Sequence, residues 1–357
     1  TKNPVGKKTV VKMVSVGDNL MHNTVYEQAK QRANGNGYDF TYAYKNVFDI
    51  IHNADIATVN QETVLSSLNP PSGYPMFNTP QEAADYLIKM GFDVVNHATN
   101  HVVDKQESGL KSTLEYWDKN PQIKVVGIYK DKADYENIRV IEKNGIKFSF
   151  LGMTESLNGL NLPKNTDLII GRTNEDEIKN QIEKAKAVSD VVIVNVHWGS
   201  EYTHKQNNFQ NNLAKNMAEW GADLIIGHHP HVIQPVEYIT RNDGTKAVVA
   251  YSLGNFISSQ DRAATMLGGM LETEFTKNET GKISITNVKF NPVINHYDRG
   301  RKNIRLYPLD IYTKELASQH GIRSKITGYN FTSAEQNFSY DYLKSIVNNT
   351  ISSEFLK

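Results

Sequence analysis

The chain has 357 residues, in which 39 lysine and arginine residues balance 39 aspartate and glutamate residues, and it contains no cysteine. A zero net charge provides no long-range field for nucleic acid or an anionic membrane, so nucleic acid is not expected as a partner and any polyanion must be held by a local site. The absence of cysteine excludes disulfides, zinc–thiolate sites, iron–sulfur clusters and thiol nucleophiles.

Strands and helices alternate along the first two thirds of the chain. Runs rich in β-branched residues predict buried strands at residues 9–16, 55–60, 93–96, 123–126, 191–196 and 224–226. Helices are predicted at residues 25–32, 42–53, 81–90, 108–118, 175–189 and 207–220. This alternation favours βαβ units and mostly parallel strand pairing.

Three turn signals indicate antiparallel hairpins within the same pattern. They are Lys143-Asn144-Gly145, Asn242-Asp243-Gly244 and residues 278–281. Parallel and antiparallel pairs should therefore coexist in an α/β protein with two stacked sheets covered by helices. From Pro292 onward the pattern is less regular, with a helix expected at residues 333–348. We expect a main domain of residues 1–291 and a C-terminal extension of residues 292–357 packed on it.

Short polar clusters follow five of the buried strands. Ligands of open α/β sheets bind beyond the carboxyl ends of the strands, so the five clusters can converge on one crevice. The clusters contain Asp18 and His22; Glu62; His97, Asn100, His101 and Asp104; His197 and Trp198; and His228, His229 and His231. Beside them, Glu201, Tyr202 and Asn255 are expected to line the walls of the same crevice.

Considered one at a time, most of these residues can also be explained by a role in the fold and not in a functional site. Asp18 is also suited to cap the following helix, and Glu62 to be a solvated loop acid. Asn100 and His101 could cap the helix expected at residues 108–118. His197 closes a buried strand and is either a hydrogen-bonded core histidine or a ligand.

The three histidines at positions 228, 229 and 231 are harder to explain as structure. Alternate residues of an extended segment face the same way, and Pro230 favours extended backbone at His229. The imidazoles of His229 and His231 are therefore expected to point at one place.

Carboxylates, amide oxygens and imidazoles together form a ligand set suited to Mn²⁺, Fe²⁺ or Zn²⁺. Two such ions about 3.5–4 Å apart, bridged by a carboxylate, could polarise a phosphoryl oxygen and activate water. His101, close to the ions without binding them, could protonate a leaving oxygen. The sequence has no phosphate-binding loop, no dinucleotide-binding glycine motif and no serine nucleophile elbow, so phosphoester cleavage or another metal-dependent hydrolysis is the favoured chemistry.

Six segments, in this order, resemble the CapA family of bacterial capsule biosynthesis, the poly-γ-glutamate synthesis and export proteins. The segments are Val16-Gly17-Asp18-Asn19-Leu20-Met21, Asn60-Gln61-Glu62-Thr63, residues 96–104, Val196-His197-Trp198-Gly199-Ser200-Glu201-Tyr202, residues 227–231 and Tyr251-Ser252-Leu253-Gly254-Asn255-Phe256. The resemblance covers about residues 9–256.

That family is similar to the calcineurin-like metallophosphoesterases, which implies a four-layer αββα sandwich of two mixed sheets with a dinuclear metal site and here a C-terminal elaboration. Carried over by position, the resemblance implies that Asp18 and His231 hold the first metal, that Glu62 bridges, that Asn100, His197 and His229 hold the second metal, and that His101 is the general acid. His22, His97, Asp104, Trp198, Glu201, Tyr202, His228 and Asn255 would line the site.

Two positions depart from the phosphoesterase pattern. Leu20 stands where the Asp-x-His motif has its histidine, although His22 could reach the same place, and the bridging aspartate is replaced by the longer Glu62. A single-metal or metal-free protein therefore stays open.

The resemblance implies an extracellular protein that is anchored to a Gram-positive cell surface through an N-terminal segment absent from this chain. The leading hypothesis is a capsule or poly-γ-glutamate biosynthesis protein with hydrolase capacity, acting on the anionic polymer or on a phosphoester. The alternative is a non-catalytic module that binds the polymer or a membrane capsule-synthase subunit. A phosphatase or nucleotidase for small substrates is a third reading.

Overall fold

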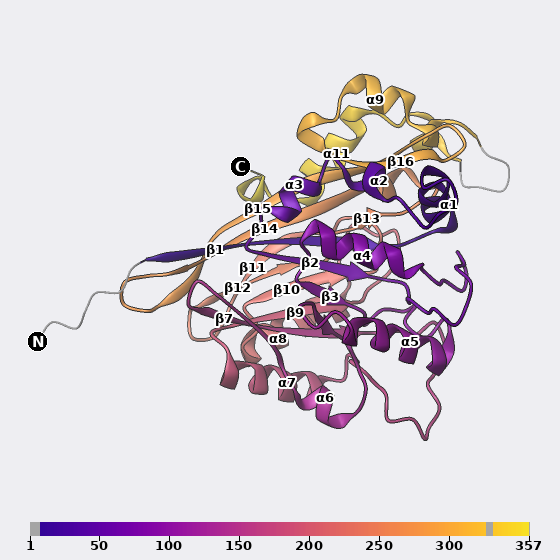
Figure 1. The fold of residues 1–357 in the computed structure, drawn as a ribbon. Coiled ribbons are helices and arrows are strands. Elements are labelled where there is room, and N and C mark those ends of the chain that lie inside the picture. Colours follow the sequence, from indigo (N-terminus) through magenta and orange to yellow (C-terminus); the bar gives the residue numbers. More distant parts are fainter. Residues whose placement is uncertain (1–7, 326–330, 357) are drawn as a thin grey trace, which may run out of the picture.

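The computed structural model describes residues 8–325 and 331–356, and two stacked β-sheets organise the chain (Figure 1). The first sheet runs in the order β16 (Lys302–Pro308), β15 (Ile283–Asp298), β14 (Leu267–Lys277), β1 (Thr9–Asn19), β2 (Ile56–Gln61), β3 (Val94–Asn96) and β4 (Lys124–Val126), with β13 (Asn255–Ile257) also paired to β1. The second runs in the order β11 (Val236–Thr240), β12 (Lys246–Ala250), β10 (Leu224–His228), β9 (Val191–His197), β7 (Ile146–Thr154) and β6 (Arg139–Lys143). The short strands β5 (Ile128–Tyr129) and β8 (Ile169–Ile170) pair separately.

The helices lie outside the two sheets and in the C-terminal part of the chain (Figure 1). The α-helices are α1 (Asn23–Arg32), α2 (Thr41–Tyr44), α3 (Phe48–His52), α4 (Gln81–Met90), α5 (Gln106–Asp118), α6 (Lys132–Glu136), α7 (Glu175–Val188), α8 (Asn208–Trp220), α9 (Lys314–Gln319), α10 (Ser333–Gln336) and α11 (Tyr340–Thr350). The 3-10 helices are η1 (Ala263–Met266), η2 (Leu309–Ile311), η3 (Gly321–Arg323) and η4 (Ser353–Phe355). Over the described residues, the helices lack the combination of length and apolar composition that a membrane crossing requires.

Both sheets are mixed, as expected from the combination of βαβ units and hairpin signals. The neighbouring strands β1, β2, β3 and β4 are parallel, and so are β12, β10, β9 and β7. The three predicted hairpins are confirmed as the antiparallel pairs β6–β7, β11–β12 and β14–β15. The parallel strands of each sheet therefore end at one edge, where the polar clusters of the sequence lie.

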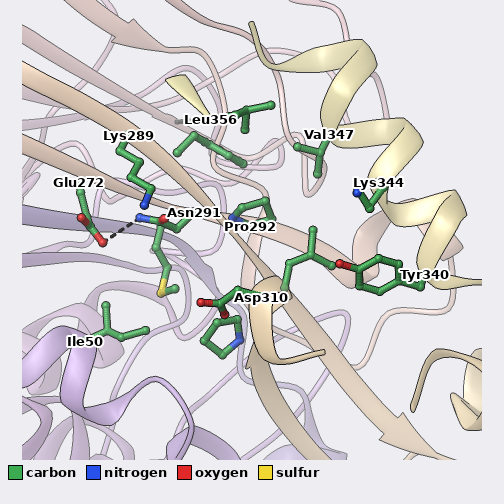
Figure 2. Close-up of a pocket in the computed structure, with 14 residues that line it drawn as sticks. Ile50, Glu272, Lys289, Asn291, Pro292, Asp310, Tyr340, Lys344, Val347 and Leu356 are labelled. Carbon is green, nitrogen blue, oxygen red and sulfur yellow. Dashed lines mark hydrogen bonds between the residues drawn. The ribbon is translucent and has the colours of Figure 1, made fainter. Parts of the chain in front are cut away.

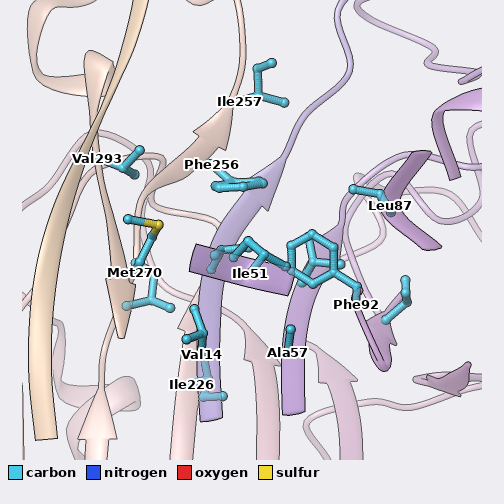
Figure 3. Close-up of a cluster of buried hydrophobic side chains, with 14 of the residues drawn as sticks. Val14, Ile51, Ala57, Leu87, Phe92, Ile226, Phe256, Ile257, Met270 and Val293 are labelled. Atoms are coloured by element: carbon cyan, nitrogen blue, oxygen red, sulfur yellow. The ribbon is translucent and has the colours of Figure 1, made fainter. Parts of the chain in front are cut away.

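The hydrophobic core shows that the chain forms four layers. Between the sheets, Phe148 of β7 packs edge-on against Phe275 of β14 with ring centroids 5.1 Å apart. On the outer face of the first sheet, Ile51 of α3 and Leu87 of α4 join the same buried cluster (Figure 3). A second cluster places α7 and α8 against the other face of the second sheet. The αββα arrangement expected from the sequence is therefore confirmed.

Two predicted helices are interrupted in the structure. The helix expected at residues 42–53 is two short helices, because α2 contacts β16 whereas α3 contacts α4, and the chain turns between them at the buried Val47. The helix expected at residues 333–348 is divided into α10 and α11 by the buried Phe338. Ser339 then starts α11, since its side chain accepts a hydrogen bond from the backbone N–H of Tyr342.

The chain continues in the first sheet beyond residue 292, where the sequence suggests a change of organisation. Pro292 lies inside β15, one residue before the pairing of that strand with β16 begins at Val293. The residues after β16 pack on the same core, which includes Phe338, Leu343 and Phe355. The change of organisation thus comes after β16, where the described residues form short helices and no further strand.

A pocket of about 470 Å³ lies between β14, β15 and helix α11 (Figure 2). Its lining carries charges of both signs, and Asn291 donates a hydrogen bond of 2.8 Å to Glu272 there. None of the residues that the sequence predicts for the functional site line this pocket.

Candidate metal centre

Strand register brings the polar clusters together at one edge of the sandwich. In the first sheet, Asp18 of β1 is paired with Asn60 of β2. In the second sheet, His197 of β9 is paired with His228 of β10. Asn60 Nδ2 lies 2.8 Å from Asp18 Oδ1 in the same sheet and 3.4 Å from His197 Nδ1 in the other sheet. The ends of the two sheets therefore meet around these side chains, which are all buried.

Glycines permit the close approach of the loops at this edge. A Cβ atom at Gly17 would lie 1.9 Å from the carbonyl oxygen of Gly254, which accepts a hydrogen bond from the backbone N–H of Asp18. A Cβ atom at Gly227 would lie 1.9 Å from the carbonyl oxygen of Tyr251, the acceptor of the Trp198 indole N–H. The fully buried Trp198 therefore anchors the loop that carries Tyr251. Residue 17 must be glycine, because a larger residue would keep Asp18 from reaching the site.

We call Asp18, Glu62, Asn100, His197, His229 and His231 the strand-end cluster. Its carboxylates and imidazoles supply two groups of potential metal ligands, in each of which the ligand atoms lie within 4.8 Å of one another.

The first group consists of Asp18, Glu62 and His231. His231 Nδ1 lies 3.1 Å from Asp18 Oδ2, and His231 Nε2 lies 3.6 Å from Glu62 Oε1. Asn255 Oδ1 also contacts His231 Nδ1 at 3.0 Å, which directs the Nε2 atom toward Glu62. His228 also contacts this group, since its Nδ1 atom lies 3.6 Å from Asp18 Oδ1.

The second group consists of Glu62, His197 and His229. His197 Nε2 lies 3.7 Å from Glu62 Oε1 and 3.0 Å from Asn100 Oδ1. The rings of His197 and His229 are 4.8 Å apart. Glu62 belongs to both groups, which is the position expected for a carboxylate that bridges two ions.

A third group, Glu201, His229 and His231, extends the cluster toward solvent. The sequence indicated Glu201 only as a wall residue, but its Oε1 atom lies 3.9 Å from His231 Nε2, and its side chain is 43% exposed. Its position two residues after a loop glycine gave no sign that it faces the histidines. Glu201 is therefore a potential ligand at the mouth of the site.

The backbone that carries the histidine pair differs from the extended geometry expected from the sequence, and that expectation is wrong. His229 and His231 have φ angles of 96° and 58°, in the left-handed region. The backbone N–H of His229 points at both carboxylate oxygens of Asp18, at 3.3 and 3.4 Å. The two rings still come within 5.8 Å of each other. Such backbone costs about 1–3 kcal/mol per residue and concentrates at functional sites.

The polar atoms of the cluster show that it fits a cation. Over the described residues, both carboxylate oxygens of Glu62 are buried without a hydrogen-bond partner, as is Nδ1 of His229. Burial raises the pKa of Glu62 well above its usual range, although the charge of His231 opposes this shift. A buried carboxylate without donors is unfavourable by several kcal/mol unless a positive charge compensates it. A divalent ion would supply that charge.

The ionisation states place His197 and His229 in the neutral, metal-binding form, whereas His231 holds a proton that a bound ion would have to displace. Burial opposes the ionisation of Asp18, but the hydrogen bond and charge of His231 outweigh it and lower the Asp18 pKa. Burial also disfavours protonated His231, yet the carboxylates of Glu62 and Asp18 raise its pKa to about 9. Burial lowers the pKa of His229 to about 3 and that of His197 well below its usual value. Neutral imidazole is the form that binds metals.

His101 is held beside the cluster with one nitrogen available. Its Nδ1 lies 2.7 Å from Asp104 Oδ2, which also accepts a hydrogen bond of 2.8 Å from the backbone N–H of Phe77. The edge of the His101 ring packs on Phe77 at 4.7 Å. Asp104 therefore fixes the tautomer of His101 so that Nε2 faces outward.

Two of the predicted lining residues face elsewhere. His97 accepts a hydrogen bond of 2.8 Å from the Trp117 indole of α5, and burial lowers its pKa to about 3. His22 accepts a hydrogen bond from the backbone N–H of Ser259 at 3.3 Å and packs against Phe77. Over the described residues, neither histidine belongs to a group that could hold a metal.

Comparison with known proteins gives a family match over most of the chain. The model of the family described as "Bacterial capsule synthesis protein PGA_cap" matches residues 12–260, which include the whole strand-end cluster. The chain is 33% identical over 280 residues to "PGA biosynthesis protein CapA" of Bacillus subtilis (strain 168), covering 76% of this chain and 69% of the relative. It is 29% identical over 304 residues to "Capsule biosynthesis protein CapA" of Bacillus anthracis, covering 81% and 71%.

Solved structures resemble the chain more distantly. A 5'-nucleotidase precursor from Thermus thermophilus has a TM-score of 0.48 at 12% identity, covering 96% of this chain and 59% of the other. A hypothetical protein from the same organism has a TM-score of 0.46 at 14% identity, covering 79% and 98%.

Proposed function

The chain belongs to the PGA_cap family of bacterial capsule synthesis proteins, and from this premise we propose that it is a metal-dependent hydrolase of the phosphoesterase type that acts in making a poly-γ-glutamate capsule. The hydrolase part is carried by Glu62, a fully buried carboxylate shared by two ligand groups and lacking a hydrogen-bond partner over the described residues. The polymer part is supported by the name of the Bacillus subtilis relative, and the capsule part also by the name of the Bacillus anthracis relative.

The donor groups suggest how ions would be held. Asp18, Glu62 and His231 would bind one ion, and Glu62, His197 and His229 would bind a second with Asn100 beside them. Mn²⁺, Fe²⁺ and Zn²⁺ all suit this set of oxygen and nitrogen donors. When bound, such ions supply positive charge that polarises a phosphoryl or carbonyl group and favours the attack of water.

The other steps fall to side chains of this chain. In its imidazolium form, His101 would donate the proton on Nε2 to the leaving oxygen of the substrate and become the neutral imidazole whose Nδ1–H is held by Asp104. Trp198 and Asn255 would keep the histidines in place, the first by anchoring the loops and the second through His231 Nδ1. Because the cluster residues are nearly all buried, the reacting group of the substrate would meet fixed dipoles in place of bulk water.

We propose a location at the surface of a Gram-positive cell, anchored through a segment that precedes this chain, since capsule polymer accumulates outside the membrane. The support is the capsule family alone. Fractionation of cells that express the full-length protein, with protease added to intact cells, would test this. Protection of the protein from the protease would contradict it.

One observation favours a non-catalytic role as the second candidate. Leu20, at the position where the phosphoesterase pattern has a histidine, is 2% exposed, and His22 is turned toward Ser259. The site would then bind the polymer, or a synthase subunit, without turning over a phosphoester.

The experiment that separates these functions combines metal analysis with a phosphodiesterase assay. Wild type is compared with the double variant His229→Ala, His231→Ala and with His52→Ala, which removes an exposed histidine on α3 as a matched control. We expect the double variant to lose metal and activity and the control to keep both. Equal metal content and equal activity in the wild type and the double variant would contradict the hydrolase proposal. Tight binding of poly-γ-glutamate without metal and without turnover would establish the second candidate.

A further inference from the structure

An arginine and a tyrosine lie together at the mouth of the strand-end cluster. Arg262 is exposed in the segment between β13 and η1, and its guanidinium carbon is 4.2 Å from the centroid of the Tyr202 ring. The Tyr202 ring in turn lies 6.2 Å from that of His231. Residue 262 falls outside the range that the family model matches.

The charge of Arg262 is not used to pair with a carboxylate of the described residues. Three other arginines form such pairs: Arg139 with Asp134, Arg241 with Asp223, and Arg305 with Asp298. Within residues 8–325 and 331–356, no carboxylate lies within ion-pair distance of the Arg262 guanidinium. The nearby carboxylate of Glu201 belongs to the ligand group of His229 and His231. Arg262 therefore has hydrogen-bond donors available for a ligand.

The backbone of Arg262 is fixed. Its carbonyl oxygen accepts hydrogen bonds from both the backbone N–H and the side-chain hydroxyl of Thr265, at 3.0 and 2.8 Å. The next residue, Ala263, donates its backbone N–H to Glu335 Oε1 at 2.7 Å. The backbone position from which the side chain extends is therefore fixed, and the stacking on Tyr202 restricts the side chain itself.

A chain of hydrogen bonds connects this segment to the cluster. Gln260 donates to the Tyr202 hydroxyl at 3.4 Å and accepts from Asn255 Nδ2 at 2.8 Å. Asn255 Oδ1 contacts His231 Nδ1 at 3.0 Å. The backbone N–H of Tyr202 also donates to the carbonyl of Pro230, between the two histidines, at 2.8 Å. The position of the Arg262 side chain is therefore coupled to the geometry of the cluster.

We propose that Arg262 binds an oxyanion of the ligand, a carboxylate or a phosphate, at the mouth of the cluster, with the Tyr202 ring holding the guanidinium in place. A guanidinium over an aromatic face keeps its N–H edge free for a two-point contact with an oxyanion. Since the net charge of the chain is zero, a local cation of this kind is what would select an anionic ligand. The ligand class rests on the proposed function.

The test is a pair of calorimetric titrations of the metal-loaded protein, one with inorganic phosphate and one with a γ-linked glutamate hexamer. Arg262→Gln and Arg262→Lys are compared with wild type and with Arg299→Gln, which neutralises an exposed arginine in the turn after β15 as the control. We expect Arg262→Gln to weaken binding about tenfold or more, the loss of a charge-assisted contact. Arg262→Lys keeps the charge without the two-point geometry and should lose less. The control should stay within about twofold of wild type.

Each outcome has a defined meaning. A loss of affinity for phosphate alone identifies the oxyanion as phosphate, a loss for the hexamer alone identifies it as carboxylate, and a loss for both supports an oxyanion site shared by the two. Unchanged affinity for both probes in Arg262→Gln, or a wild type that binds neither probe at millimolar concentration, would overturn the proposal. Metal content and thermal unfolding of each variant show that the cluster and the fold are intact. The experiment measures binding and not turnover. Its result can therefore be interpreted even if the protein proves to have no hydrolase activity.

Discussion

Two groups of buried histidines in this protein differ in how the surrounding residues satisfy them. Where β15 meets η3, both ring nitrogens of His320 have protein partners: Nε2 lies 3.0 Å from the carbonyl of Asn295, and Nδ1 accepts from the backbone N–H of Ile322 at 2.9 Å. The neighbouring His296 contacts the Tyr312 hydroxyl at 2.7 Å. We call His296 and His320 the C-terminal pair.

The strand-end cluster differs mainly in its carboxylate, because His197 has contacts with Asn60 and Asn100, and over the described residues Nε2 of His296 also lacks a hydrogen-bond partner. Asp298, next to the C-terminal pair, is bound by Arg305 at 3.1 Å, whereas Glu62 in the cluster has no hydrogen-bond donor over the described residues. The backbone of His229 and His231 is left-handed, whereas that of the C-terminal pair is not. The comparison teaches that burial and histidine content alone do not identify a ligand site. The features that indicate a ligand site here are carboxylate oxygens without a hydrogen-bond partner and left-handed backbone at the histidines.

The largest effect is expected for Glu62→Gln. The amide keeps the shape of the side chain but removes the charge shared by both ligand groups, so metal affinity should fall by about 100-fold or more. Competition titration with a chelator measures this. His320→Ala, in the C-terminal pair, is the matched comparison and should leave metal affinity within about threefold of wild type. Equal losses in the two variants would erase the difference between the two regions.

When stability is measured in place of metal affinity, the larger effect is expected in the C-terminal pair and the smaller one in the strand-end cluster. His320 is fully buried and packs against Tyr297 and Phe338 at ring distances of 4.6 and 4.7 Å. His320→Ala should therefore lower the free energy of unfolding by about 2–4 kcal/mol, because it leaves a cavity and two unpaired polar groups. His229→Ala, measured without metal, should change it by less than about 1 kcal/mol. Urea denaturation in the presence of a chelator tests both values, and a larger loss in His229→Ala would contradict this assignment.

A third effect concerns pH and the structural histidine His97. Burial lowers its pKa to about 3 in the folded chain, compared with about 6.5 in an unfolded one. The unfolded state therefore takes up a proton that the folded state does not, so the contribution to stability is complete above pH 6.5 and is lost as pH falls toward 3. His97→Gln, which can still accept from the Trp117 indole, should reduce this slope by about 1.4 kcal/mol per pH unit. Denaturation midpoints between pH 4 and 7 measure it, and identical slopes would count against a neutral buried His97.

Much of this architecture could be predicted from the sequence because its signals are local. Alternating helices and strands, the three hairpin turns and the polar clusters after the strands all depend on short segments. Helix α4 matches its predicted range, and β9 extends the prediction by one residue to His197. That polar side chains follow the parallel strands was sufficient to predict that they share an edge.

The features that the sequence did not predict depend on contacts between distant segments. The left-handed backbone at His229 is held by Asp18, more than 200 positions away in the chain. Glu201 lies in a family segment and was predicted to line the site, but its contact with His231 depends on the fold. Arg262 lies outside these segments, and its contact with Tyr202 also depends on the fold. The less regular pattern from Pro292 onward suggested a separate C-terminal extension, yet β15 passes through Pro292.

The most direct test of the central claim, that strand ends from both sheets surround cations, is an anomalous scattering map from crystals grown with Mn²⁺. The account predicts two peaks that share Glu62, one among Asp18, Glu62 and His231 and the other among Glu62, His197 and His229. A map without a peak beside Glu62, from protein that retains Mn²⁺ elsewhere or not at all, would contradict it.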